Sequence, residues 1–145
     1  MAEERVLKIT DIASDGEATE KVEMETTCTY YGTPDNYTVV FDELFAEDMK
    51  SRTTLRVKNG SCAHLLRQGA INTELIIEKG VRHNCAYSTP YGELMVGITA
   101  TEFISNAKEN SLHLQMNYTV DFYGEINQTK EMTVEVGNVI PERKD

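Results

Sequence analysis

The stretch that most constrains the fold is "LHLQMNYTVDFY", residues 112–123, because hydrophobic and polar side chains alternate along it. The apolar parity consists of Leu112, Leu114, Met116, Tyr118, Val120 and Phe122. A helix would scatter these six side chains around its circumference, whereas a strand collects them on one face, because its side chains point alternately to opposite sides. The stretch therefore predicts a long β-strand with one buried face.

The same alternation recurs in "ELMVGITATEF" and "NYTVVFDEL", and turn signals such as "TPDN", "NG", "KG", "TPYG" and "YGEINQ" separate the candidate strands. Strands are predicted near residues 5–11, 21–31, 37–45, 53–58, 61–67, 73–78, 82–88, 93–101, 112–123 and 131–137. Only residues 44–51 and 102–110 have room for a short helical turn. The links have hairpin length, which favours an antiparallel meander.

No segment carries a sustained helical period, so a doubly wound α/β sheet is excluded. A meander of eight to ten strands with one dry face either closes into a barrel or folds into two packed sheets. Closure removes the exposed edges that promote aggregation. We therefore predict an all-β fold in which residues 1–145 form one domain, a single antiparallel meander closed into a β-barrel.

The net charge of −10 is uneven, since residues 1–50 alone carry 13 acidic and 4 basic side chains. No basic stripe occurs elsewhere, and nucleic acid and anionic membranes are recognised mainly through Lys and Arg. Neither is an expected partner. The acidic segment is interpreted as a solvated face, with a docking site for a basic partner as the alternative.

Several other classes of site find little support. Cys28, Cys62 and Cys85 are odd in number and lack a C-x-x-C spacing, which predicts free thiols. His64 with Cys62 and His83 with Cys85 could in principle offer zinc ligands, but such alternation usually reflects packing, and we expect neither metal nor cofactor. No nucleophile elbow is present, so an enzyme is the least favoured of the three function classes, after a ligand-binding barrel and an interaction module. The chain shows no long apolar run or signal peptide, which predicts a cytoplasmic location.

A resemblance runs through "FDE" at 41–43, "TTLRV" at 53–57, "LLRQG" at 65–69, "YSTPYGEL" at 87–94 and "LHLQMNY" at 112–118. In order and spacing these pieces resemble the small bacterial YwiB-like proteins, a family of unknown function. The resemblance covers about residues 5 to 137 and implies a lipocalin-like or calycin-like barrel. It implies no activity.

Candidate site residues are polar side chains that the alternation directs inward. Glu43 has the parity of Tyr37, Val39 and Phe41, and a buried carboxylate needs a partner. Arg67 is the natural one, but Arg67 and His64 have opposite parities. A two-residue turn at Asn59-Gly60 would send His64 inside, and a longer or bulged turn would send Arg67 inside.

We favour Arg67, because the Arg-x-Gly piece belongs to the family-like pattern. The hypothesis is a cluster of Glu43, Arg67 and Tyr87, with Thr89 beside it, that binds a small polar or anionic ligand in the barrel or at its mouth. The alternative is a structural ion pair in a packed, ligand-free barrel that interacts with a protein partner or with its own copies. Thr89–Gly92 is interpreted mainly as a turn.

Overall fold

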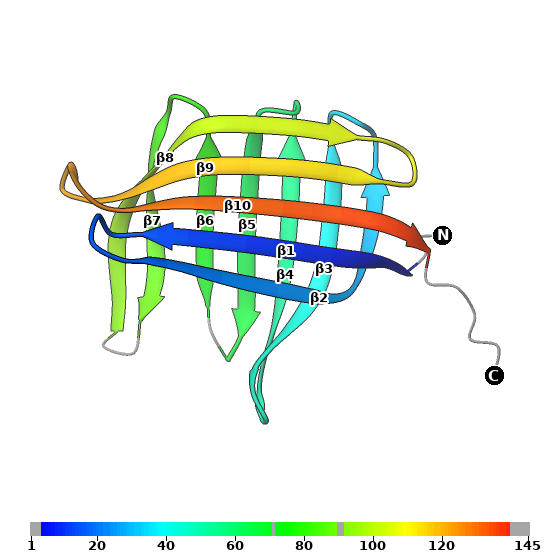
Figure 1. Ribbon diagram of the computed structural model, residues 1–145, viewed down its shortest axis with the longest axis horizontal. Coiled ribbons are helices and arrows are strands. Elements are labelled where there is room, and N and C mark those ends of the chain that lie inside the picture. Colours follow the sequence, from blue (N-terminus) through cyan, green and yellow to red (C-terminus); the bar gives the residue numbers. More distant parts are fainter. Residues whose placement is uncertain (1–3, 71, 90–91, 140–145) are drawn as a thin grey trace.

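A computed structural model gives the structure of residues 4–70, 72–89 and 92–139 (Figure 1). Within these ranges, residues 44–46, 87–89 and 138–139 are described for the backbone and not for the side chains. The part of the chain that is described contains no helix that could cross a membrane. The cytoplasmic location stays a prediction.

The described residues form ten β-strands, and each predicted strand is among them. They are β1 (Glu4–Ser14), β2 (Thr19–Gly32), β3 (Tyr37–Ala46), β4 (Met49–Lys58), β5 (Cys62–Gly69), β6 (Thr73–Glu78), β7 (Arg82–Thr89), β8 (Gly92–Ala107), β9 (Leu112–Phe122) and β10 (Glu125–Val139). Consecutive strands pair antiparallel, and β1 pairs with both β2 and β10, which closes the barrel. The predicted all-β fold, a single meander closed into a barrel, is confirmed.

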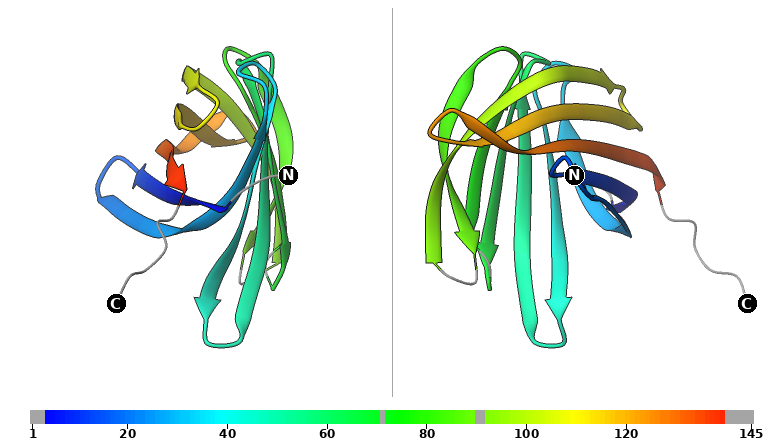
Figure 2. Two further views of the ribbon diagram at one scale, coloured as in Figure 1. Left: turned by 90° about the vertical axis from the view of Figure 1, so that its right-hand side faces the viewer. Right: turned by 60° about the vertical axis from the view of Figure 1, so that its left-hand side comes forward.

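Two strands are long because they belong to both layers of the flattened barrel. β2 pairs with β1 along Thr19–Thr29 and with β3 only at Thr29–Gly32. β8 pairs with β7 in its first half and with β9 from Gly97 onward. One layer, β8-β9-β10-β1-β2, therefore crosses the other layer, β3 to β7, at a large angle, as Figures 1 and 2 show.

Alternation along the strands builds the core between the two layers. The largest fully buried side chains include Leu7, Tyr37, Val39, Leu55, Ile77, Ile98, Leu114, Met116 and Val134. Aromatic side chains fill one end, where the rings of Tyr30 and Tyr37 meet edge to face at 5.9 Å. Their hydroxyls bond to the Lys108 carbonyl and the Ser105 hydroxyl, each at 2.7 Å. These aromatic side chains pack the interior of the barrel at this end.

A pair of charges ties three strands together on the outer face. Arg82 on β7 reaches across Gly97 on β8 and donates to both oxygens of Asp121 on β9, at 2.7 and 2.9 Å. A Cβ at Gly97 would overlap the Arg82 guanidinium, so a larger residue there would displace Arg82 from Asp121. The hydrogen bonds from Arg82 lower the pKa of the Asp121 carboxyl below its usual value.

The two stretches that had room for a helical turn form strands and a loop instead. Residues 44–51 and 102–110, each expected to have room for a helical turn, lie in the β3–β4 hairpin and in the second half of β8 with the loop that follows. Cross-strand pairing of Leu44 with Lys50 and of Phe103 with Met116 satisfies backbone groups that a helical turn would have satisfied locally. The expected turn at 123–128 is also shorter, because positive φ angles at Tyr123 and Gly124 complete it and β10 begins at Glu125.

Candidate functional site

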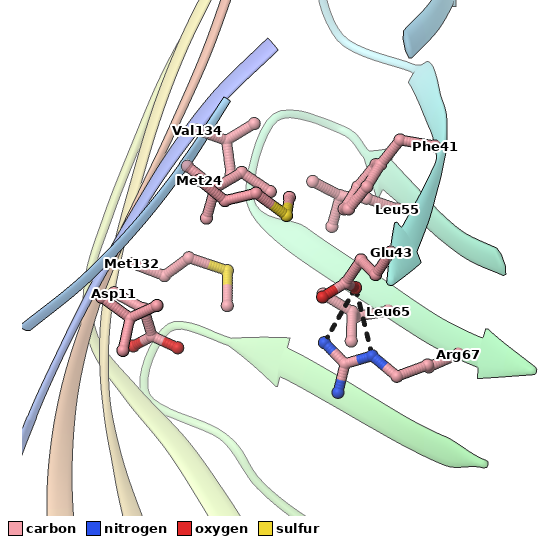
Figure 3. A pocket seen from close by; sticks show the side chains of 11 residues that line it. Asp11, Met24, Phe41, Glu43, Leu55, Leu65, Arg67, Met132 and Val134 are labelled. Carbon is pink, nitrogen blue, oxygen red and sulfur yellow. Dashed lines mark hydrogen bonds and ion pairs between the residues drawn. The ribbon is translucent and has the colours of Figure 1, made fainter. Parts of the chain in front are cut away.

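The barrel contains a partly open cavity of about 110 Å³ away from the aromatic end (Figure 3). Its walls come from β1, β2, β3, β4, β5 and β10. Apolar side chains make most of the lining, namely Ile9, Val22, Met24, Phe41, Leu55, Leu65, Met132 and Val134. Three charged side chains complete it, and these are Asp11, Glu43 and Arg67. Such a lining, mostly apolar with a few polar groups, is typical of small-molecule sites.

Glu43 points inward, as its parity predicted. Its side chain is 14% exposed, and its Oε1 accepts a hydrogen bond from the Thr53 hydroxyl at 2.5 Å. Arg67 donates to the same oxygen from Nε at 3.2 Å, and its Nη2 forms an ion pair with that oxygen at 3.2 Å (Figure 3). These residues lie on β3, β4 and β5, so the cluster links three neighbouring strands. A partly buried carboxylate is thereby neutralised.

The β4–β5 turn decides that Arg67 faces inward. Asn59 and Gly60 both have positive φ angles, and the Ser61 N–H donates to the Lys58 carbonyl at 3.1 Å. Ser61 is then an extra residue, because Lys58 pairs with Cys62 rather than with Ser61. The turn is therefore the longer of the two alternatives, and the preference for Arg67 is confirmed.

His64 consequently lies on the outer face. It pairs with Arg56 across β4, and its Nε2 is 2.7 Å from the Glu74 carboxylate on β6. It takes no part in the cavity.

Tyr87 and Thr89, the other predicted site residues, lie in β7, where they pair with Leu94 and Gly92 of β8. Their side chains are not among those described, so their membership of the site stays a prediction. Pro90 and Tyr91, in the middle of the predicted turn, lie outside the described residues.

The wall opposite Arg67 holds a second charged pair that the sequence analysis missed. The Lys130 ammonium on β10 is 3.1 Å from Asp11 Oδ2 on β1, and the two side chains are 15% and 26% exposed. The other Asp11 oxygen, Oδ1, is buried and accepts no hydrogen bond from the described residues. The cavity wall thus contains an acceptor without a donor, which is costly unless something else supplies one.

The alternation of the sequence could have identified Asp11, Lys130 and Thr53 as inward-facing. Asp11 follows Leu7 and Ile9 at intervals of two, and Lys130 precedes Met132 and Val134 in the same way. Thr53 likewise shares the parity of Leu55. The rule that singled out Glu43 applies to all three, although only the closure of β1 on β10 brings Asp11 and Lys130 together.

The cysteines and remaining histidines form no second site. Cys28, Cys62 and Cys85 are free thiols, and burial raises the pKa of Cys28 to about 11. His83 contacts Glu78, with 2.9 Å between Nε2 and Oε1. Among the described residues no group of three His, Cys, Asp or Glu side chains could hold a metal ion.

Comparison with known proteins places this architecture in a family. Residues 7–134 match the model of a domain of unknown function, DUF1934. The chain belongs to the DUF1934 family. The crystal structure of the ywiB protein from Bacillus subtilis is similar, with a TM-score of 0.76 and 21% identity over 94% of each chain, a likeness that shows the fold. The predicted YwiB-like membership is confirmed. No curated protein matches the chain.

The DUF1934 description assigns no activity, so function must be argued from the cavity. Its chemistry is set by charge balance. Two carboxylates, from Asp11 and Glu43, face one guanidinium, and the ammonium of Lys130 stands behind Asp11. Both cations are engaged by these carboxylates. The site can therefore accept hydrogen bonds more readily than it can neutralise an added negative charge.

Proposed function

We propose that this DUF1934 barrel binds, in its cavity, a small molecule with an apolar body and a head that donates hydrogen bonds. The observation that carries the proposal is the Asp11 carboxylate, whose Oδ1 is buried without a donor in the wall facing Arg67. An amine, amide or hydroxyl in the cavity would satisfy that oxygen once the Asp11 carboxylate rotates toward it, because Oδ1 is not exposed in this structure. The apolar body would pack against the aliphatic and thioether side chains that make up the rest of the lining.

The volume limits the ligand. A cavity of about 150 Å³ in another protein takes benzene. At about 110 Å³ this one suits a molecule of roughly five non-hydrogen atoms, or the end of a longer one that extends toward the mouth.

Charge narrows the expected head group from polar or anionic to polar or cationic. An anion in the cavity would lie near the carboxylates of Asp11 and Glu43, and the Arg67 guanidinium that could offset them already contacts Glu43. Each like-charge contact in a poorly solvated site costs free energy.

A packed, ligand-free module is the second candidate, and one observation favours it. Glu43 is already neutralised by Arg67 and accepts from Thr53, so this pair needs no ligand. In that case ordered water alone would serve Asp11, and the cluster would fix the barrel register.

The experiment is a thermal-shift series with three ligands that share a branched four-carbon body and differ in the head group. The ligands are isobutylamine, isobutanol and isobutyrate, at matched ionic strength near pH 7. With a dissociation constant near 10 mM and about 100 mM ligand, the amine stabilises by about 1.4 kcal/mol, which raises Tm by about 4 °C. The alcohol gives a smaller rise and the anion none.

The matched control is Val134→Phe, which fills the cavity from a fully buried position without changing its charged groups. The ligand-dependent shift should disappear in this variant. Equal shifts for the three heads, or a shift that persists in Val134→Phe, would reject the cavity as the binding site. No shift with any head would favour the packed module.

A further inference from the structure

β2 and β3 separate after a short paired segment and leave a fork in the barrel wall. They pair only from Thr29–Gly32 to Tyr37–Val40. Residues Thr19–Cys28 of β2 then pair with β1 on one side and with no described strand on the other. Residues Phe41–Ala46 of β3 likewise pair only with β4. Figures 1 and 2 show the two segments diverging, and we call them the two arms of the fork.

The β2 arm is a strand edge with unused hydrogen-bonding capacity. In an antiparallel strand about half of the backbone N–H and C=O groups point to each side, so about five residues of this arm present theirs to the fork. At its vertex the fork holds a groove of about 360 Å³ between Thr26–Thr29 of β2 and Val40–Asp42 of β3. An added strand would therefore find both backbone partners and space.

Charge defines what the fork attracts. Outside the cavity, residues 19–28 and the β3–β4 hairpin, residues 41–52, carry six acidic side chains and three basic ones. The acids are Glu20, Glu23, Glu25, Asp42, Glu47 and Asp48, and the bases are Lys21, which contacts Glu23, and Lys50 and Arg52, which contact Asp42. This excess is part of the chain's net charge of −10. It complements a basic segment and steers its approach.

Apolar and acidic side chains alternate between the two faces of the β2 arm. Val22, which is 55% exposed, and Met24 line the cavity side, whereas Glu23 and Glu25 have the opposite parity. A strand paired with β2 would place alternate residues over Val22 and beside Glu23.

We infer that the fork is a docking site for an extended segment of another protein, in which apolar and basic residues alternate, added antiparallel or parallel to the β2 arm. A second copy of this chain is disfavoured as the occupant, because it would bring the same excess of carboxylates against the first. This inference concerns the strand edge and does not depend on the ligand proposed for the cavity.

The test uses a synthetic peptide of about nine residues that alternates lysine and valine, with acetylated and amidated ends. Binding is followed by isothermal titration, and hydrogen exchange of the backbone amides locates it. We expect new protection in residues 19–28, affinity that falls as salt is raised, and at least a fivefold loss of affinity in Glu23→Lys/Glu25→Lys.

Two control peptides separate strand pairing from simple attraction. A peptide with the same charge and three valines replaced by proline cannot pair as a strand, and a glutamate-valine peptide has the wrong charge. Both should leave residues 19–28 unprotected. Sedimentation velocity is run in parallel on the free protein.

Equal protection by the proline peptide, protection confined to other strands, or no binding at low salt would overturn the inference. Self-association that protects residues 19–28 without peptide would also overturn it, because the occupant would then be a second copy.

Discussion

Replacing Arg67 with methionine tests whether the ion pair in the cavity wall stabilises the barrel. Methionine preserves much of the volume and removes the hydrogen bond and the ion pair to Glu43, whose Oε1 keeps the bond from the Thr53 hydroxyl. Breaking a fully buried pair costs about 3–5 kcal/mol, and an exposed pair contributes about 0.2–1 kcal/mol. Here the two side chains are 23% and 14% exposed, so we expect an intermediate loss of about 2 kcal/mol.

For a chain of this size the loss corresponds to a fall in Tm of about 6 °C, measured by circular dichroism and checked by urea unfolding. The matched control is the double variant Arg67→Met/Glu43→Gln, which removes the uncompensated carboxylate. It should recover most of the lost stability, so that, with the Glu43→Gln single variant completing the double-mutant cycle, the coupling energy is at least about 1.5 kcal/mol.

A single variant that loses less than about 0.5 kcal/mol would refute the reasoning, because it would place the pair among ordinary surface contacts. So would additive effects of the two substitutions, since residues that interact directly do not behave independently.

Three further outcomes follow from the structure. Gly97→Ala should lower Tm in the native background and have little effect in Arg82→Ala, where no guanidinium crosses the glycine; equal effects in both backgrounds would contradict this contact. Because the folded-state pKa of Asp121 is lowered, its contribution is present above the unfolded value near 3.9 and is lost as pH falls through the folded pKa; urea unfolding should therefore show the stability gap to Asp121→Asn closing in acid rather than staying constant. Cys62, which is only partly buried, should react with a thiol reagent at about pH 8 well before Cys28, whose pKa is about 11, and the reverse order would show that burial does not control reactivity.

The alternation in the sequence predicts the strands because buried and exposed side chains follow one another within a few residues of each strand. Parity together with the turn signals predicts each of the ten strands within a barrel of eight to ten, and parity alone predicts the inward direction of Glu43. The ends of the strands are harder to predict. β10 begins at Glu125 and β8 continues to Ala107 because both segments pair with β9. Cross-strand hydrogen bonds override the local turn and helix preferences there.

The site depends on strand register and on the closure of the barrel, and neither can be predicted from the alternation of side chains. Asn59-Gly60 suits a two-residue turn, and only the extra residue Ser61 places Arg67 inside. Asp11 and Lys130 stand near opposite ends of the sequence, so their contact arises when β1 pairs with β10. The same parity rule would have marked each of them as inward, but not as partners.

The most direct test of the cavity as a ligand site is a crystal structure of the protein grown with isobutylamine. The account predicts electron density for the amine within the barrel, its nitrogen within hydrogen-bonding distance of Asp11 Oδ1 and its isobutyl group between Met24 and Leu65. Crystals in which saturating amine leaves the cavity filled by side chains or by water alone would contradict it.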